Sequence, residues 1–83
     1  MLNRELNLKA DVVIDGEKYM LSTIDLRLEH IGGRFETMLF PYDGDEVNWG
    51  VVLYHQRYRT KEEAVVEHNE LLKLLQNGEK FWE

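Results

Sequence analysis

Cysteine is absent from this chain of 83 residues, which excludes disulfide bonds, thiolate metal sites and a cysteine nucleophile. Long apolar runs are absent too, since none approaches the ~20 residues that a membrane-spanning helix needs. The N-terminal segment, MLNRELNLKAD, alternates and lacks the apolar core of a signal peptide. The length predicts one globular domain over residues 1–83, and these absences predict a location in the cytoplasm and away from membranes.

Basic residues are scarce relative to acidic ones. The 10 Lys and Arg residues against 16 Asp and Glu residues give a formal net charge of −6. Such a surface repels phosphate backbones unless its basic residues cluster, so direct nucleic-acid binding is not expected. An acidic surface instead complements a basic partner.

The first half of the chain shows the period-two alternation of strands. Alternate residues from Leu6 to Ile14 are apolar, which predicts a half-buried strand over about residues 5–14. Asp15-Gly16 predicts a two-residue type I′ hairpin turn that sets Ile14 opposite Glu17. A second strand is predicted over about residues 17–28. It could bury Tyr19, Leu21 and Thr23, or the set of opposite parity, Met20, Ile24, Leu26 and Leu28, and a bulge between residues 22 and 25 would reconcile the two sets.

The single proline bears on the third predicted strand, over about residues 34–40. Pro41 is expected to end that strand, because proline has no N–H for the ladder. The segment VNWGVVLYHQRY alternates again and predicts a fourth and longest strand over about residues 47–58.

A helix is predicted over about residues 61–76. Thr60 and Glu63 have the spacing of a capping box, and Asn77-Gly78 is typical of a helix end. The apolar stripe at helical spacing comprises Ala64, His68, Leu71, Leu72 and Leu75. Only this helix can cover a face of the sheet. The predicted fold is therefore α+β: a four-stranded antiparallel meander with one C-terminal helix packed on one face.

Catalytic and metal-binding patterns are weak. His30, His55 and His68 have no diagnostic spacing for a metal site. We expect His68 to be a buried residue that hydrogen-bonds to a strand, and we expect no metal and no cofactor. The acidic YDGDE segment lacks the later ligands of a calcium loop and is predicted to be a hairpin turn. Nucleophile-elbow and phosphate-loop patterns are missing too, so the chain is predicted not to be an enzyme.

Aromatic residues are the more informative feature. Both parities of the fourth predicted strand carry large apolar groups, whereas one helix covers only one face of the sheet. Exposed aromatic patches mark protein interfaces, and a homodimer through the open face is the simplest case. In the alternative, the sheet edges wrap round the helix and Phe81-Trp82 folds back onto it. A cross-strand ion pair between Glu36 and Arg57 is also expected.

Three segments resemble a family of small proteins of uncharacterised function that phages and prophages encode: YMLSTIDLRLEH, GRFETMLF and RYRTKEEAVVEH. The resemblance covers residues 19–40 and 57–68. It implies a phage origin more than a mechanism. The residues that fall in the shared motifs are Ser22, Thr23, Asp25, His30, Glu36, Thr37, Arg57, Tyr58 and His68.

A small acidic phage protein without catalytic machinery is expected to act by binding. We therefore predict an accessory protein that binds and modulates a host protein, for example as an anti-CRISPR-like inhibitor of a host defence nuclease, whose basic channel an acidic surface can occupy. The alternatives are a structural or virion-associated assembly protein, and a module that binds a metal or nucleotide through its histidines. The predicted partner-binding residues are Trp49, Tyr54, Arg57, Tyr58, Arg59, Phe81, Trp82, Asp43, Asp45 and Glu46.

Overall fold

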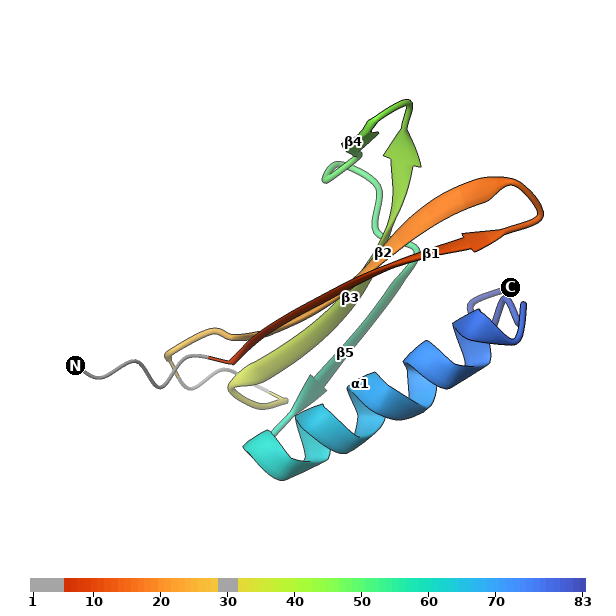
Figure 1. The fold of residues 1–83 in the computed structure, drawn as a ribbon. Helices are drawn as coiled ribbons and strands as arrows, with labels where there is room; N and C mark the ends of the chain where they lie inside the picture. The colour runs from red at the N-terminus through yellow and green to blue at the C-terminus, as the bar shows by residue number, and fades with distance from the viewer. Residues whose placement is uncertain (1–5, 29–31) are drawn as a thin grey trace.

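The computed structural model describes residues 6–28 and 32–83, which form an antiparallel sheet with one helix across one face (Figure 1). The α+β fold and the four-stranded meander are as predicted, with the strands paired in the order β1, β2, β3, β5 and the short β4 paired to the far end of β3. The elements are β1 Asn7–Ile14, β2 Glu17–Asp25, β3 Phe35–Asp43, β4 Glu46–Val47, β5 Tyr54–Tyr58 and α1 Lys61–Gln76. No helix in the described ranges has the length and hydropathy to span a bilayer.

The β1–β2 hairpin confirms the predicted turn. Asp15 and Gly16 both have positive φ, at 52° and 82°, as a type I′ turn requires. Ile14 lies opposite Glu17, and the register continues without interruption to the pair Asn7 and Ile24. The strand therefore contains no bulge, and Tyr19, Leu21 and Thr23 are the set that faces α1. The same alternation continues along the strand because Thr23 can be buried: its hydroxyl is hydrogen-bonded in the interior.

Strand β2 ends earlier than predicted, at Asp25 rather than near residue 28. The Asp25 carboxylate accepts the backbone N–H of Arg27 at 2.7 Å, and Arg27 has a φ of 71°. The same carboxylate accepts Arg34 Nε at 2.7 Å, and these hydrogen bonds, led by the one from Arg34, lower the pKa of Asp25. A short-range side-chain turn thus ends the strand.

Pro41 does not end β3, which runs on to Asp43. The Pro41 carbonyl accepts the N–H of Asn48 at 2.8 Å, so its backbone faces away from β2. On that side β5 pairs with β3 only as far as Leu39, and β4 begins its pairing at Tyr42. The missing proline N–H therefore falls in the gap between β5 and β4, where no ladder bond is lost.

The fourth predicted strand, 47–58, is divided into β4 and β5 by residues 48–53. Asn48 turns the chain: its carbonyl accepts Val51 N–H at 3.3 Å, and its side chain accepts Gly50 N–H at 3.1 Å. The alternating pattern in this segment is therefore not strand throughout.

The helix has the predicted boundaries. Thr60 and Glu63 form the capping box in both directions, and Gly78 follows the last turn with a φ of 82°. The residues that α1 buries against the sheet are Ala64, His68, Leu71 and Leu75. The main core joins the last two to Val12, Ile14, Tyr19, Leu21 and Leu39.

The C-terminal tail folds back onto this core. The ring centroids of Trp82 and Tyr19 lie 5.1 Å apart, and those of Phe81 and Tyr54 lie 5.0 Å apart. Of the two possibilities left open by the sequence for the tail, the structure shows the packed one.

Candidate functional site along strand β5

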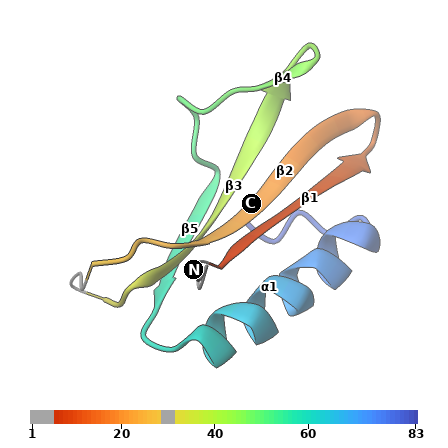
Figure 2. The same ribbon diagram turned by 60° about the vertical axis from the view of Figure 1, so that its left-hand side comes forward.

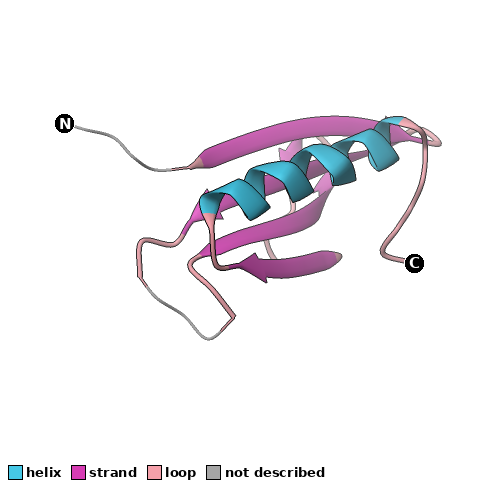
Figure 3. Cartoon of the chain, turned by 90° about the horizontal axis from the view of Figure 1, so that it is seen from below, coloured by secondary structure: helices cyan, strands magenta, loops and turns pink. Residues whose placement is uncertain are grey.

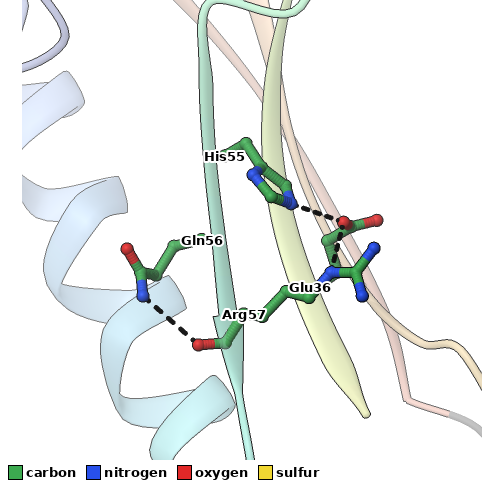
Figure 4. Close-up of polar contacts among 4 residues, drawn as sticks. All are labelled: Glu36, His55, Gln56 and Arg57. Atoms are coloured by element: carbon green, nitrogen blue, oxygen red, sulfur yellow. Dashed lines mark hydrogen bonds and ion pairs between the residues drawn. The ribbon is translucent and has the colours of Figure 1, made fainter. Parts of the chain in front are cut away.

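Strand β5 is an edge of the sheet. It pairs with β3 on one side, and no described strand pairs with its other side. Its side chains alternate: Tyr54, Gln56 and Tyr58 share the face that carries α1, whereas His55 and Arg57 share the open face. Figure 4 shows Gln56 directed toward the helix, with His55 and Arg57 on the opposite side next to Glu36.

A groove of about 530 Å³ lies between β5 and the first turns of α1. It exists because β5 lies beside the helix rather than beneath it (Figure 3). The strand contributes Tyr54, Gln56 and Tyr58, and the helix contributes Glu62, Glu63, Val66 and Glu67. The groove therefore combines apolar walls with an acidic rim. Val66, on the helix wall of the groove, is 57% exposed.

Tyr58 forms part of the groove wall but is itself buried, with 8% exposure. It packs in a second core cluster with Leu6, Phe35 and Ala64. Its hydroxyl is buried as well. Burial raises the pKa of this hydroxyl, so Tyr58 is a neutral packing residue at physiological pH.

On the open face, Glu36 holds two side chains of β5 together (Figure 4). Its Oε2 atom accepts a hydrogen bond from His55 Nε2 at 2.7 Å and one from Arg57 Nε at 3.1 Å. The Glu36 side chain is only 7% exposed. The predicted pair between Glu36 and Arg57 is confirmed, and it neutralises a buried carboxylate.

A smaller recess of about 260 Å³ lies along this open face. Its lining runs from Glu36 and Ile24 at one end, over Lys9, Ser22 and Met38, to Phe40 and Trp49 at the other. Trp49 packs edge-on against Phe40, with ring centroids 4.9 Å apart. Burial lowers the pKa of Lys9.

Exposed apolar side chains concentrate around β5. The large ones in residues 6–28 and 32–83 are Val13, Leu28, Trp49, Val51, Val52 and Val66. Three of them, including Trp49 at 58% exposure, belong to the loop that leads into β5, and Val66 faces the strand across the groove. Four of these six thus flank one edge strand, which is how interaction surfaces differ from scattered apolar residues.

The predicted partner-binding residues divide into three groups. Trp49, Tyr54, Arg57, Tyr58 and Arg59 lie on β5 or beside it, although Tyr58 is buried. Phe81 and Trp82 are half-buried against the core. Asp43, Asp45 and Glu46 are exposed at the turn between β3 and β4, at the opposite end of the sheet from the start of α1 (Figures 1 and 2). The binding role of all three groups stays a prediction.

The histidines lie apart from one another where the structure describes them. His68 is buried and hydrogen-bonds to the Thr23 hydroxyl on β2, as expected of a residue at the junction of helix and sheet. His55 bonds to Glu36 on the other face of the sheet. His30 lies outside the described residues. The described residues hold no group of three or more potential metal ligands.

The sequence reasoning missed the helix side of the groove. Val66 sits off the apolar stripe on an otherwise polar helix surface, next to Glu62 and Glu67. This out-of-place valine was the available signal. Its meaning depends on the placement of α1 beside β5, which the sequence pattern does not contain.

The chain matches no known protein-family model, no curated protein and no solved structure. The resemblance to phage-encoded proteins therefore stays a prediction.

Proposed function

We propose that this chain is a small binding protein, not an enzyme, that docks on a partner protein through the β5 side of the molecule. The concentration of exposed apolar side chains around one free strand edge carries the proposal. Apolar patches beside an unpaired edge are a liability unless a partner covers them. The two histidines that the structure describes support it as well, because each is engaged in a structural contact.

The partner that we propose is a host protein. The three motif segments that resemble phage-encoded proteins support this choice. A nucleic-acid-guided defence nuclease suits the net charge of −6, because its channel is basic and an acidic protein can occupy it. In this proposal the protein acts in the cytoplasm of the host.

Self-assembly is the second candidate, because a free strand edge can also pair with the same edge of another copy. The open face, with its recess ending at Trp49, offers a second surface for a homodimer. In either case the protein would be a structural or virion-associated assembly component.

Affinity capture from infected host cells tests the binding proposal. Tagged wild-type protein is compared with Val66→Ser and with the control Val13→Ser, which removes an exposed valine from the other edge strand, β1. We expect one stoichiometric host protein with wild type and the control, and its loss with Val66→Ser. Equal capture by all three would remove β5 as the binding side. Light scattering that shows a concentration-dependent dimer, with only the protein itself recovered, would favour assembly.

A further inference from the structure

We propose that β5 accepts an extended basic segment of the partner as an added antiparallel strand, with one apolar side chain in the groove beside α1. This inference rests on the proposed function and names the chemistry that the same site recognises.

The outward-facing backbone groups of β5 follow from its pairing with β3. The carbonyl of Leu39 accepts Leu53 N–H at 2.8 Å, so the backbone of Leu39 faces β5. In an antiparallel pair, the N–H and C=O groups of successive residues point to alternate sides of the strand. The β5 residues that pair with Leu39, Thr37 and Phe35 therefore direct their N–H and C=O groups toward β3. The residue between the first two of those partners is His55. Its N–H and C=O therefore point away from the sheet, where an incoming strand can pair with them.

Arg57, the next residue of β5 whose backbone faces outward, already accepts a hydrogen bond of this kind. The Gln56 side-chain amide donates to the Arg57 carbonyl at 3.3 Å (Figure 4). This side chain occupies the place of a donor from an added strand. Pairing therefore centres on His55, and an incoming N–H at the next position replaces the Gln56 amide.

The groove supplies side-chain selectivity. Strands added to a sheet edge gain affinity from main-chain hydrogen bonds and specificity from pockets that receive alternate side chains. An added strand on β5 directs every second side chain toward the helix side, over Tyr54, Tyr58 and Val66. At about 530 Å³ the groove accommodates an apolar side chain such as leucine.

The charge of the groove selects a basic segment. In the part of the chain that the structure describes, the groove lining includes three glutamates and no lysine or arginine. Glu63 is held by Thr60 in the capping box, which leaves Glu62 and Glu67 to face a ligand. Lysine or arginine two positions to either side of the apolar residue would lie on the same face as these carboxylates.

The same charges disfavour a second copy at this edge. Symmetric pairing of two β5 strands would bring two acidic rims together on one face of the joined sheet. Like charges in that arrangement repel. A basic partner segment satisfies both the backbone edge and the rim.

Calorimetric titration of the full chain with the capped peptide Thr-Lys-Thr-Leu-Thr-Lys-Thr tests the inference. Leucine and both lysines share the groove side, and threonines oppose His55. Replacing both lysines by glutamate should abolish binding. N-methylation of the two inner threonines, whose N–H groups would face β5, should also abolish it. N-methylation of leucine, on the far edge, should leave it intact.

Protein variants locate the site. Glu67→Lys should weaken binding about tenfold, as reversal of a rim charge beside the ligand, and Glu70→Lys, an equal charge change on α1 outside the groove lining, should not. Equal binding of the two N-methylated peptides would overturn strand addition. Equal effects of the two charge variants would overturn the groove as the site.

The outcomes separate this inference from the proposed function. No binding of the lysine peptide, combined with partner capture that Val66→Ser abolishes, overturns strand addition by a basic segment and leaves the binding side in place. Peptide binding as predicted, with no partner captured through the β5 side, confirms the peptide site and overturns the proposed function.

Discussion

His68 on α1 and Thr23 on β2 share a hydrogen bond of 2.7 Å between Nδ1 and Oγ1. Thr23 Oγ1 also lies 2.5 Å from Thr37 Oγ1 on β3, so three polar side chains join the helix to the two central strands. Both threonines are fully buried and His68 is 4% exposed. Because a buried polar group is costly without a partner, these contacts fix the position of α1 on the sheet.

Stability is predicted to fall in mild acid because of His68. Burial lowers the pKa of His68, and the positive charge of Lys9 adds to this effect. As pH falls through about 6.5, the unfolded chain takes up a proton at this position while the folded chain does not. The unfolded state then binds more protons, so the free energy of unfolding decreases below about pH 6.5. Urea unfolding at a series of pH values measures this slope.

The variant His68→Gln isolates the contribution of the titration. It carries a constant packing cost, which unfolding at about pH 8 measures because His68 is then neutral in both states. The slope between about pH 6.5 and pH 5 should become shallower in this variant. An unchanged slope would mean that another group causes the acid sensitivity.

Gly33 is predicted to be intolerant of substitution, because the chain that leads into β3 passes close to the backbone at the end of β5. Its φ is +127°, and an added Cβ would lie 2.1 Å from the Tyr58 carbonyl oxygen and 2.4 Å from the carbonyl carbon. The backbone must move to relieve this contact, so Gly33→Ala should cost at least ~3 kcal/mol. Gly44 has a φ of +65° and open space, so Gly44→Ala should cost only ~1 kcal/mol. Chemical denaturation followed by circular dichroism gives both values, and similar costs would contradict the close approach.

The features that the sequence predicted well are local ones. Positive φ at Asp15 and Gly16 sets the hairpin, and the Thr60–Glu63 capping box sets the start of α1. Each depends on residues within a few positions of one another, so the chemistry is visible in the printed chain. The helix phase followed from the cap and placed His68 toward the sheet.

The features that the sequence did not predict depend on distant neighbours. Residues 48–53 alternate like a strand, but the chain turns there because Asn48 bonds to Pro41 and Gly50. Strand β2 needs no bulge because His68 and Thr37, far away in sequence, satisfy Thr23. The groove depends on the lateral placement of α1 beside β5, so Val66 and its glutamates could not be assembled into a site from periodicity alone.

Glu36 and Arg57 should be energetically coupled. The Glu36 side chain is 7% exposed and that of Arg57 is 29% exposed, so their pair is partly shielded from water. Arg57→Met leaves a buried carboxylate with His55 as its remaining partner among the described residues and should cost ~2 kcal/mol. The double variant with Glu36→Gln should cost ~1 kcal/mol less than the sum of the single variants. Additivity within ~0.3 kcal/mol in denaturant unfolding would show that the pair contributes nothing of its own.

The two tryptophans should separate stability from binding. Trp82 is half-buried against Tyr19, so Trp82→Ala should lower the free energy of unfolding by ~2 kcal/mol, about half the loss for a fully buried ring. Trp49 is 58% exposed, so Trp49→Ala should cost less than ~1 kcal/mol through its contact with Phe40. In affinity capture at a temperature where both variants are folded, only Trp49→Ala should lose partner. If Trp82→Ala instead lost the partner while its free energy of unfolding stayed unchanged, the Trp82 side chain would contribute to binding and not to folding. The C-terminal tail would then belong to the interface.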